Sequence, residues 1–246
     1  MSENSQLREL KIEIEQLKLK LKKSEEFFAI VIHELRTPLT TITLALEQIQ
    51  ETASKNNKFY LQTLKDSLKQ LVELTERVMK VFQLEQGKIE LQLTKVNLND
   101  FLVNYCSARF QALNKEKIVT ELVSKLPAKA VFIQADVEYL QLVCENIINN
   151  AQRFVPKDGT GHFTIQAELK GQNKVRVNFS DNGCGVLEQN KVAIFERFVS
   201  CGVKNTTGLG LYICQKIMEL HKGRIWCEDT FGGGATFSLE LNCKRS

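Results

Sequence analysis

The sequence predicts two structural parts: a long helical hairpin, followed by an α/β sandwich in which helices pack on a mostly antiparallel sheet. Two observations lead to this fold class, α plus α/β. Apolar residues recur at intervals of three and four up to Gly87, as in amphipathic helices, and Gly87 is a helix stop. From Lys88 onward, alternating strand-like segments interleave with helical ones, which favours a two-layer sandwich.

Length and composition agree with this division. A chain of 246 residues is long for one core, and 43% hydrophobic with 25% charged residues is ordinary for a soluble protein. The net charge of +4, without a basic run that carries aromatics, gives no support for nucleic-acid binding. The longest apolar run, FFAIVI, is too short to span a membrane, and the N-terminus lacks a signal-peptide pattern. We expect a cytoplasmic protein with no membrane segment in this chain.

The seven cysteines show no CxxC pair and no metal-ligand spacing with histidine. An odd number of scattered cysteines indicates reduced thiols in a cytosolic protein. Cys184 and Cys201 fall in loops near the clusters described below, so a redox role for either one stays open.

Residues 1–26 predict a coiled-coil helix. Their apolar residues alternate steps of three and four: Leu7, Leu10, Ile14, Leu17 and Leu21. The same register continues into the next segment. This heptad pattern predicts pairing of two chains. The alternative is a single amphipathic helix that docks on its own domain.

Residues 27–51 predict a helix that carries a histidine beside its apolar stripe. His33 is followed by Glu34, and Thr37 lies one turn on and shares its face. Pro38 has no N–H, so we expect the helix to bend just past the histidine. One histidine on such a helix is usually structural, so this segment alone does not establish a function.

A second helix completes the predicted hairpin. ASKNN (53–57) reads as a turn, and apolar residues recur from Leu61 to Leu84. One hairpin cannot cover both apolar faces, so two copies should form a dimeric four-helix bundle. The predicted domains are therefore a coiled coil over 1–26, a dimerisation hairpin over 27–87 and a second domain over 88–246.

The second domain reads as alternating strands and helices. Strands are expected at 89–96, 117–123, 131–134, 161–169, 174–181, 224–229 and 235–241, with helices at 97–113, 136–154 and 208–221. Asp136 is the expected cap of the second of these helices, and GQN (171–173) the expected hairpin turn.

The first polar cluster is ENIINNAQRF (145–154). Asn146 and Asn150 are four residues apart on one helix, so both amides point the same way. Amide oxygens suit a hard ion such as Mg²⁺, which bridges to phosphates. The alternative is a solvated helix face.

Two glycine-rich clusters follow. In DNGCGV, Asp181 ends a strand and can accept from an exocyclic amine, while Gly183 and Gly185 allow a flat ring to approach the backbone. Tight turns look similar, so this cluster is weak by itself. In TTGLGLYICQK, Gly208 and Gly210 open a helix whose free N–H groups form an anion site.

The order of these clusters resembles the sensor histidine kinases of two-component systems. The Asn-rich helix, DxGxG, FERF (195–198), GLGL and GGGATF resemble their N, G1, F, G2 and G3 boxes, and HELRTPL resembles their H box. The resemblance covers residues 24 to 242. It implies a hairpin dimer followed by an ATP-binding domain of the GHKL type.

The resemblance assigns roles to individual residues. His33 looks like the phospho-acceptor, Glu34 the neighbour that helps to take its proton, and Thr37 the residue that orients water when a partner regulator is dephosphorylated. In the second domain Asn150 looks like the Mg²⁺ ligand and Asp181 the adenine reader. The remaining implied nucleotide contacts are Asn146, Gly183, Gly185, Phe195, Phe198, Gly208, Leu209 and Gly210.

Four departures from the family pattern change the expected contacts. Arg153 stands where the family usually has Lys. Thr206 replaces the first glycine of the G2 box, and the segment 199–207 is short, so Lys204 becomes the expected main phosphate contact there. Ala235 replaces a usual Ser or Thr, which leaves Thr236 as the nearby hydroxyl.

The resemblance implies a kinase that autophosphorylates His33 from Mg-ATP and passes the phosphoryl group to an aspartate of a response regulator. Imidazole suits this step because it is mostly neutral, yet nucleophilic, at pH 7. A nucleotide-binding signalling scaffold, or mainly a phosphatase of the regulator that uses Thr37, are the alternatives. An ATPase of the chaperone or topoisomerase type does not explain the histidine hairpin.

Overall fold

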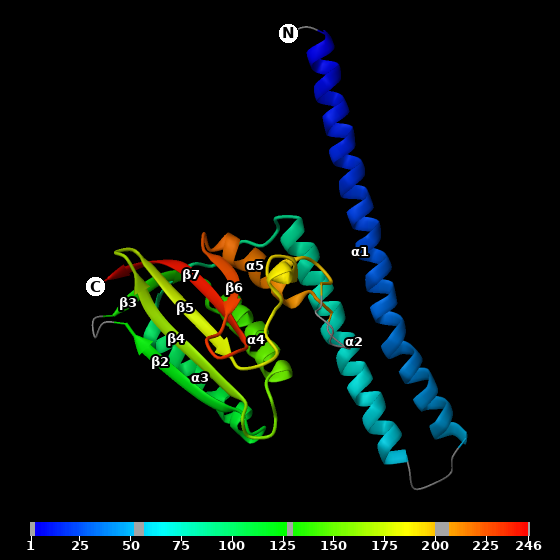
Figure 1. Ribbon diagram of the computed structural model, residues 1–246. Helices are drawn as coiled ribbons and strands as arrows, with labels where there is room; N and C mark the ends of the chain where they lie inside the picture. Colours follow the sequence, from blue (N-terminus) through cyan, green and yellow to red (C-terminus); the bar gives the residue numbers. More distant parts are fainter. Residues whose placement is uncertain (1–2, 52–56, 127–129, 200–206, 246) are drawn as a thin grey trace. The chain divides into compact units, whose positions relative to one another are not determined.

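The computed structural model describes residues 3–51, 57–126, 130–199 and 207–245 (Figure 1). The chain divides into two compact units, Met1–Met79 and Lys80–Ser246. The boundary falls inside the second long helix rather than at its end. Within the described residues, no helix is both long and apolar enough to cross a membrane.

Helix α1 (Glu3–Glu51) and helix α2 (Asn57–Glu85) confirm the predicted hairpin. Helix α1 runs through Pro38 without interruption, and the bend expected there stays a prediction. Most of the predicted turn lies at 52–56, outside the described residues. Gly87, at φ +62°, ends α2 as predicted: its N–H donates to the Leu84 carbonyl, and the Lys88 N–H donates to that of Gln83.

The apolar stripe of α1 separates into a buried half and an exposed half. Phe27 and Val31 are each only 7% exposed, whereas Phe28 and Ile32 are 53% and 56% exposed. In α2 the buried apolar positions include Leu74, while Leu68 is exposed. The hairpin thus covers one side of each helix and leaves a second apolar side uncovered.

The second unit alternates strands and helices in the predicted order. The strands are β1 (Thr94–Asn97), β2 (Val119–Lys125), β3 (Val131–Ala135), β4 (His162–Lys170), β5 (Lys174–Asp181), β6 (Arg224–Asp229) and β7 (Ala235–Arg245). The helices are α3 (Leu98–Lys115), α4 (Val137–Phe154) and α5 (Gly210–Leu220), with short 3-10 turns η1 (Glu188–Asn190) and η2 (Ala193–Phe195).

The predicted strand at 89–96 is mostly wrong, because only its last three residues belong to β1. The backbone before β1 has a different partner: the Gln92 N–H donates to the Asp136 carboxylate at 2.9 Å. That side chain also caps α4, as predicted, by accepting from the N–H groups of Glu138 and Tyr139.

The described strands form one sheet in the order β1-β3-β7-β5-β4-β2. Strand β6 also pairs with β7, along residues 235–240, whereas β3 pairs with β7 along residues 243–245. Among the strands that the structure describes, only β2 and β4 pair in parallel. Helices α3, α4 and α5 cover one face of the sheet (Figure 1). Alternate residues of β4 and β5, such as Phe163, Ile165, Val177 and Phe179, are buried on this inner face, which confirms the two-layer sandwich.

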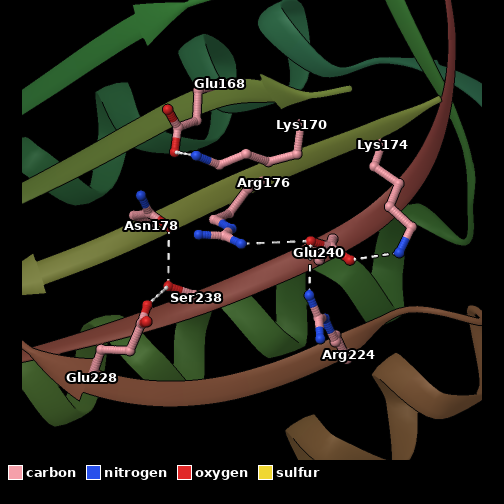
Figure 2. A network of polar contacts seen from close by, with 9 residues as sticks. All are labelled: Glu168, Lys170, Lys174, Arg176, Asn178, Arg224, Glu228, Ser238 and Glu240. Atoms are coloured by element: carbon pink, nitrogen blue, oxygen red, sulfur yellow. Dashed lines mark hydrogen bonds and ion pairs between the residues drawn. The ribbon is translucent and has the colours of Figure 1, made fainter. Parts of the chain in front are cut away.

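The other face of the sheet carries a polar network (Figure 2). Glu240 of β7 is only 5% exposed and receives Lys174 at 2.8 Å, Arg224 at 3.1 Å and Arg176 at 3.7 Å. The guanidinium carbons of both arginines lie under 5 Å from the centre of the Trp226 ring, at 4.8 and 4.7 Å. Long cationic side chains thus cover the outer face in place of a second helical layer.

Candidate functional site

The segment around His33 is exposed and locally organised. His33 and Thr37 are both exposed on α1, one turn apart. Pro38 leaves the Glu34 carbonyl without its helical donor. Two threonines of the next turn donate to carbonyls four residues back, Thr40 to Arg36 at 2.9 Å and Thr41 to Thr37 at 3.1 Å. Such hydrogen bonds from a side chain to the backbone weaken a helix. The turn that follows His33 therefore lacks one backbone hydrogen bond at Pro38 and carries two competing threonine hydroxyls.

Helix α4 presents the Asn pair beside its buried face, and both side chains are half-buried. Its apolar residues, among them Val143 and Ile147, are buried in the sandwich. The Asn146 amide nitrogen donates to the Leu142 carbonyl at 2.9 Å, which leaves the Asn146 Oδ1 facing away from its own helix backbone. The Asn150 amide makes no hydrogen bond with the described part of the chain, so its oxygen is available to a ligand. Arg153 lies exposed in the last turn.

Asp181 sits at the end of β5 and is only 5% exposed. Its Oδ1 accepts the N–H of Gly183 at 2.9 Å and that of Ala235 at 3.3 Å. Burial raises the pKa of this carboxyl above its ordinary value, although the two N–H groups oppose that shift. No described residue occupies Oδ2, so one oxygen is held by the backbone while the other remains for a ligand donor.

Glycines line the backbone around Asp181. A Cβ on Gly183 would lie 2.8 Å from the Phe154 carbonyl oxygen at the end of α4. Gly234, at φ +99°, approaches so closely that a Cβ there would lie 2.0 Å from the Asp181 carbonyl oxygen. Gly185 packs against Gly234 in turn. The turn between β6 and β7 therefore forms part of the wall around Asp181.

Thr236 lies on the face of the sheet opposite Asp181. In the register of β5 and β7, Ser180 pairs with Thr236, so Ala235 shares the face of Asp181. The Thr236 hydroxyl is 2.9 Å from those of both Ser180 and Thr230. The structure brings the Ala235 N–H to Asp181 but does not bring the Thr236 hydroxyl there.

The segment between FERF and GLGL has its two ends held together. Phe195 is buried and meets Phe237 edge to face, with ring centres 6.5 Å apart. Phe198 has an unusual φ of +62°, and its N–H donates to the Gly208 carbonyl at 3.0 Å. A Cβ on Gly208 would lie 2.5 Å from the Phe198 backbone, so only glycine fits there. Lys204, Thr206 and Cys201 lie outside the described residues.

Helix α5 begins without a side-chain cap, unlike α3 and α4. Its first residue follows the fully buried Leu209, whose side chain bonds no N–H of the first turn. Gly210 faces α4, and a Cβ there would lie 2.7 Å from the Asn146 Oδ1. The uncapped N–H groups of α5 thus begin beside Asn146, which is the arrangement of an anion site.

Three features of the site could not be anticipated from the sequence. The Ala235 N–H and the Phe154 carbonyl are backbone groups, which no side-chain pattern reveals. Arg197, inside FERF, pairs with Glu85 at 3.3 Å, and the Tyr212 hydroxyl donates to the same carboxylate. These partners lie more than 100 residues apart in the chain.

The cysteines that the structure describes fall into two environments. Cys184, in the loop after Asp181, is exposed, whereas Cys106, Cys144, Cys214, Cys227 and Cys243 are buried. Burial raises the pKa of Cys106 and of Cys227 to about 12, which keeps both thiols protonated. A redox role of Cys184 stays a prediction.

Comparison with known protein families assigns both parts of the chain. Residues 23–87 match the family described as His Kinase A (phospho-acceptor) domain. Residues 135–245 match the family described as histidine kinase-, DNA gyrase B- and HSP90-like ATPase. The chain belongs to the sensor histidine kinases.

Individual relatives agree with this assignment. The sensor protein kinase WalK of Staphylococcus aureus is 27% identical over 227 residues, which are 89% of this chain and 36% of that protein. Histidine kinase ThkA, solved with the response regulator protein TrrA, superposes with a TM-score of 0.73 at 24% identity over 92% of this chain and 63% of that one. ShkA, solved with AMPPNP, gives 0.68 at 25% identity over 87% and 45%. The chain thus spans about a third to a half of the curated relatives it matches.

Proposed function

We propose that this histidine kinase transfers the γ-phosphoryl group of Mg-ATP to His33 and then to an aspartate of a response regulator. The observation that carries the proposal is the site around Asp181. A carboxylate oxygen held by two N–H groups lies beside a glycine wall, and an uncapped helix start lies beside Asn146. The relatives solved with AMPPNP and with a response regulator support nucleotide and partner.

Asp181 and the helix start divide the recognition of ATP. The Asp181 Oδ2 accepts the adenine amine, and Gly183 and Gly185 allow the ring close to the backbone. The N–H groups at the start of α5 bind phosphate oxygens, together with Arg153 and Lys204. Phe195 and Phe198 anchor the first end of the intervening segment over the nucleotide, and the Phe198 N–H joins that end to Gly208.

The Asn pair fits a magnesium ion. Within the described residues, no group of three His, Cys, Asp or Glu side chains could hold a metal, so amide and phosphate oxygens are the ligands expected. The Asn150 oxygen would bind the ion, and Asn146 would support the phosphates. When bound, Mg²⁺ neutralises phosphate charge.

His33 supplies the nucleophile. A ring nitrogen attacks the γ-phosphorus, the bond to the β–γ bridging oxygen breaks, and ADP leaves. Glu34, its neighbour on α1, takes the ring proton. The exposure of His33 leaves it accessible first to the nucleotide and then to the regulator's aspartate.

Two copies of the chain should pair through the uncovered apolar sides of α1 and α2. Phe28, Ile32 and Leu68 are about half exposed in one copy, and a four-helix bundle would bury them. The N-terminal heptads of α1 would extend this pairing as a coiled coil. We expect a cytoplasmic homodimer.

A second activity, dephosphorylation of the regulator, is favoured by Thr37. Its side chain is exposed one turn from His33 on the same face, where a hydroxyl could orient water toward a phosphoaspartate. Thr37→Ala should slow loss of phosphate from the regulator but leave autophosphorylation unchanged.

The test is incubation with γ-labelled ATP and Mg²⁺. We expect acid-labile, base-stable label on the wild type, loss of label in His33→Gln and in Asn150→Ala, and normal labelling of the matched control His162→Gln. His162 is an exposed histidine on β4. Absence of label on the wild type, or label that persists in His33→Gln, would contradict the proposal.

A further inference from the structure

We propose that His221 is a positioning residue that sets the axial position of α5 against α4, and thereby places the uncapped start of α5 for the ATP phosphates. This inference rests on the proposed function. His221 follows the last residue of α5, and its side chain is only 6% exposed.

The hydrogen bonds of His221 determine which ring nitrogen carries the proton. The Asp136 backbone N–H can only donate, and it lies 3.1 Å from Nε2. The Ile217 carbonyl can only accept, and it lies 2.8 Å from Nδ1. The imidazole is therefore neutral, with its hydrogen on Nδ1 and the Nε2 lone pair directed at Asp136.

These two bonds join the end of α5 to the start of α4. Ile217 belongs to α5, and Asp136 is the residue that caps α4. The two residues bonded to the ring are distant in sequence, and the bond to Asp136 spans 85 positions. The side chain of His221 thus links the two helices that carry the proposed phosphate and metal contacts.

Three contacts show that the helices run antiparallel in register. Gly210 meets Asn146, the Cys214 thiol lies 3.7 Å from the Val143 carbonyl, and His221 meets Asp136. From Asp136 to Asn146 the rise along α4 is about 15 Å, and from Gly210 to His221 along α5 it is about 16 Å, at 1.5 Å per residue. His221 and Gly210 therefore mark the two ends of one matched contact.

The contact at the phosphate end tolerates little sliding. A Cβ at Gly210 would already lie 2.7 Å from the Asn146 Oδ1, so the helix backbone packs directly on that amide. Displacement of α5 by one residue, about 1.5 Å, would move Asn146 or separate it from the helix start. The His221–Asp136 bond opposes this displacement from the far end.

Three substitutions separate positioning from general support of the fold. His221→Gln keeps an acceptor near the Nε2 position and should preserve the bond to Asp136. His221→Asn keeps a donor near Nδ1 for Ile217 but loses the bond between the helices. His221→Leu loses both bonds and leaves the buried Asp136 N–H without a partner.

The experiment measures binding of Mg-ATP and of adenosine to the full chain by calorimetry and by competition. We expect His221→Asn and His221→Leu to raise the Kd for Mg-ATP about tenfold with adenosine affinity unchanged, because Asp181 reads the base independently. His221→Gln should restore Mg-ATP affinity to within about threefold of the wild type.

Each other outcome is decisive. Equal Mg-ATP affinity of the wild type and His221→Asn would overturn the positioning role and leave the proposed function intact. A parallel loss of ATP and adenosine binding would show that His221 only supports the fold. A wild type that binds no ATP would overturn the proposed function and this inference together.

Discussion

His33 and Asp181 are held in opposite ways. His33 is exposed on a single helix, and the hydrogen bonds around it join residues four apart, such as Thr41 and Thr37. Asp181 is only 5% exposed, and one of its oxygens accepts from Ala235, 54 residues away. His33 thus lies among solvent and residues of its own helix, whereas Asp181 contacts a backbone group that is distant in the sequence.

The difference follows from what each residue is proposed to do. A phospho-acceptor must be reached by a nucleotide and by a partner protein, so its reactivity has to come from the imidazole itself. A base reader must discriminate, and a buried carboxylate with one oxygen already bonded has few ways to reorient. In the proposed function, burial thus accompanies recognition of the base, and exposure accompanies transfer of the phosphoryl group.

The largest expected effect is at Asp181. Asp181→Asn should raise the Kd for Mg-ATP at least about 100-fold, because its amide N–H groups would face the adenine amine. His33→Gln should leave that Kd unchanged. Calorimetric titration of both variants measures the contrast, and near-normal ATP binding by Asp181→Asn would remove Asp181 as base reader.

Asp181→Asn should also change the pH dependence of the protein's stability. Burial raises the pKa of Asp181 above its ordinary value of 3.8, so the stability it contributes is present in acid and is lost as pH rises through the raised value. Asp181→Asn should therefore unfold at an equal or higher temperature than the wild type at pH 7, and lose this advantage near pH 3.

The second effect concerns Gly234. Gly234→Ala should destabilise the second unit, Lys80–Ser246, by about 2–3 kcal/mol, because the new Cβ would collide with the Asp181 backbone in a left-handed conformation. It should also weaken ATP binding. Gly232→Ala is the matched control: it shares a positive φ, but nothing lies within 4 Å of its Cβ, so urea unfolding should show about 1 kcal/mol and ATP binding should not change.

A smaller effect, on stability without any on ATP binding, is expected at Glu240 on the outer face of the sheet. Burial opposes ionisation of Glu240, but hydrogen bonds from Lys174 and Arg224 hold its pKa below the ordinary value. Glu240→Gln should cost about 1–2 kcal/mol in urea unfolding at pH 7, with ATP binding unchanged. The stabilisation by Glu240 is present above the ordinary pKa and is lost as pH falls through the lowered one, so the two proteins should converge near pH 3.

The smallest effect is confined to backbone. Lys222 follows α5 at φ +56°, a conformation that glycine adopts more readily than lysine. The N–H groups of Lys222 and the next residue donate to helix carbonyls three and five residues back, as those of Gly87 and its successor do after α2. Lys222→Gly should stabilise the unit by about 0.5–1 kcal/mol, measured by urea unfolding, with Gly87→Ala as the converse change. Destabilisation by Lys222→Gly would mean that its side chain contributes more than the strain costs.

Elements with local causes were predictable. The N-cap at Asp136, the stop at Gly87 and the hairpin around 171–173 depend on residues a few positions apart, and the structure has all three. The strand expected at 89–96 was mostly wrong, because the Gln92 N–H finds its partner in Asp136, 44 residues on. Alternation of residue types does not reveal a distant acceptor.

The candidate site divides in the same manner. The motifs around His33, Asn146, Asp181 and Gly208, in this order along the chain, were enough to indicate the histidine kinases, because each motif is a local signature. The face taken by Thr236 was not readable, since it depends on how β7 registers with β5. A shift of one residue exchanges the two faces of a strand.

By itself the sequence predicted which helices form, the cap of α4 at Asp136, and which side chains are candidates to accept, ligate or attack. The tertiary structure decided which of those groups meet: Asp181 with Ala235, Gly210 with Asn146, and His221 with Asp136. The physical reason is range. Propensities and caps act over a few residues, whereas sheet register and helix packing join backbone groups that lie tens of residues apart.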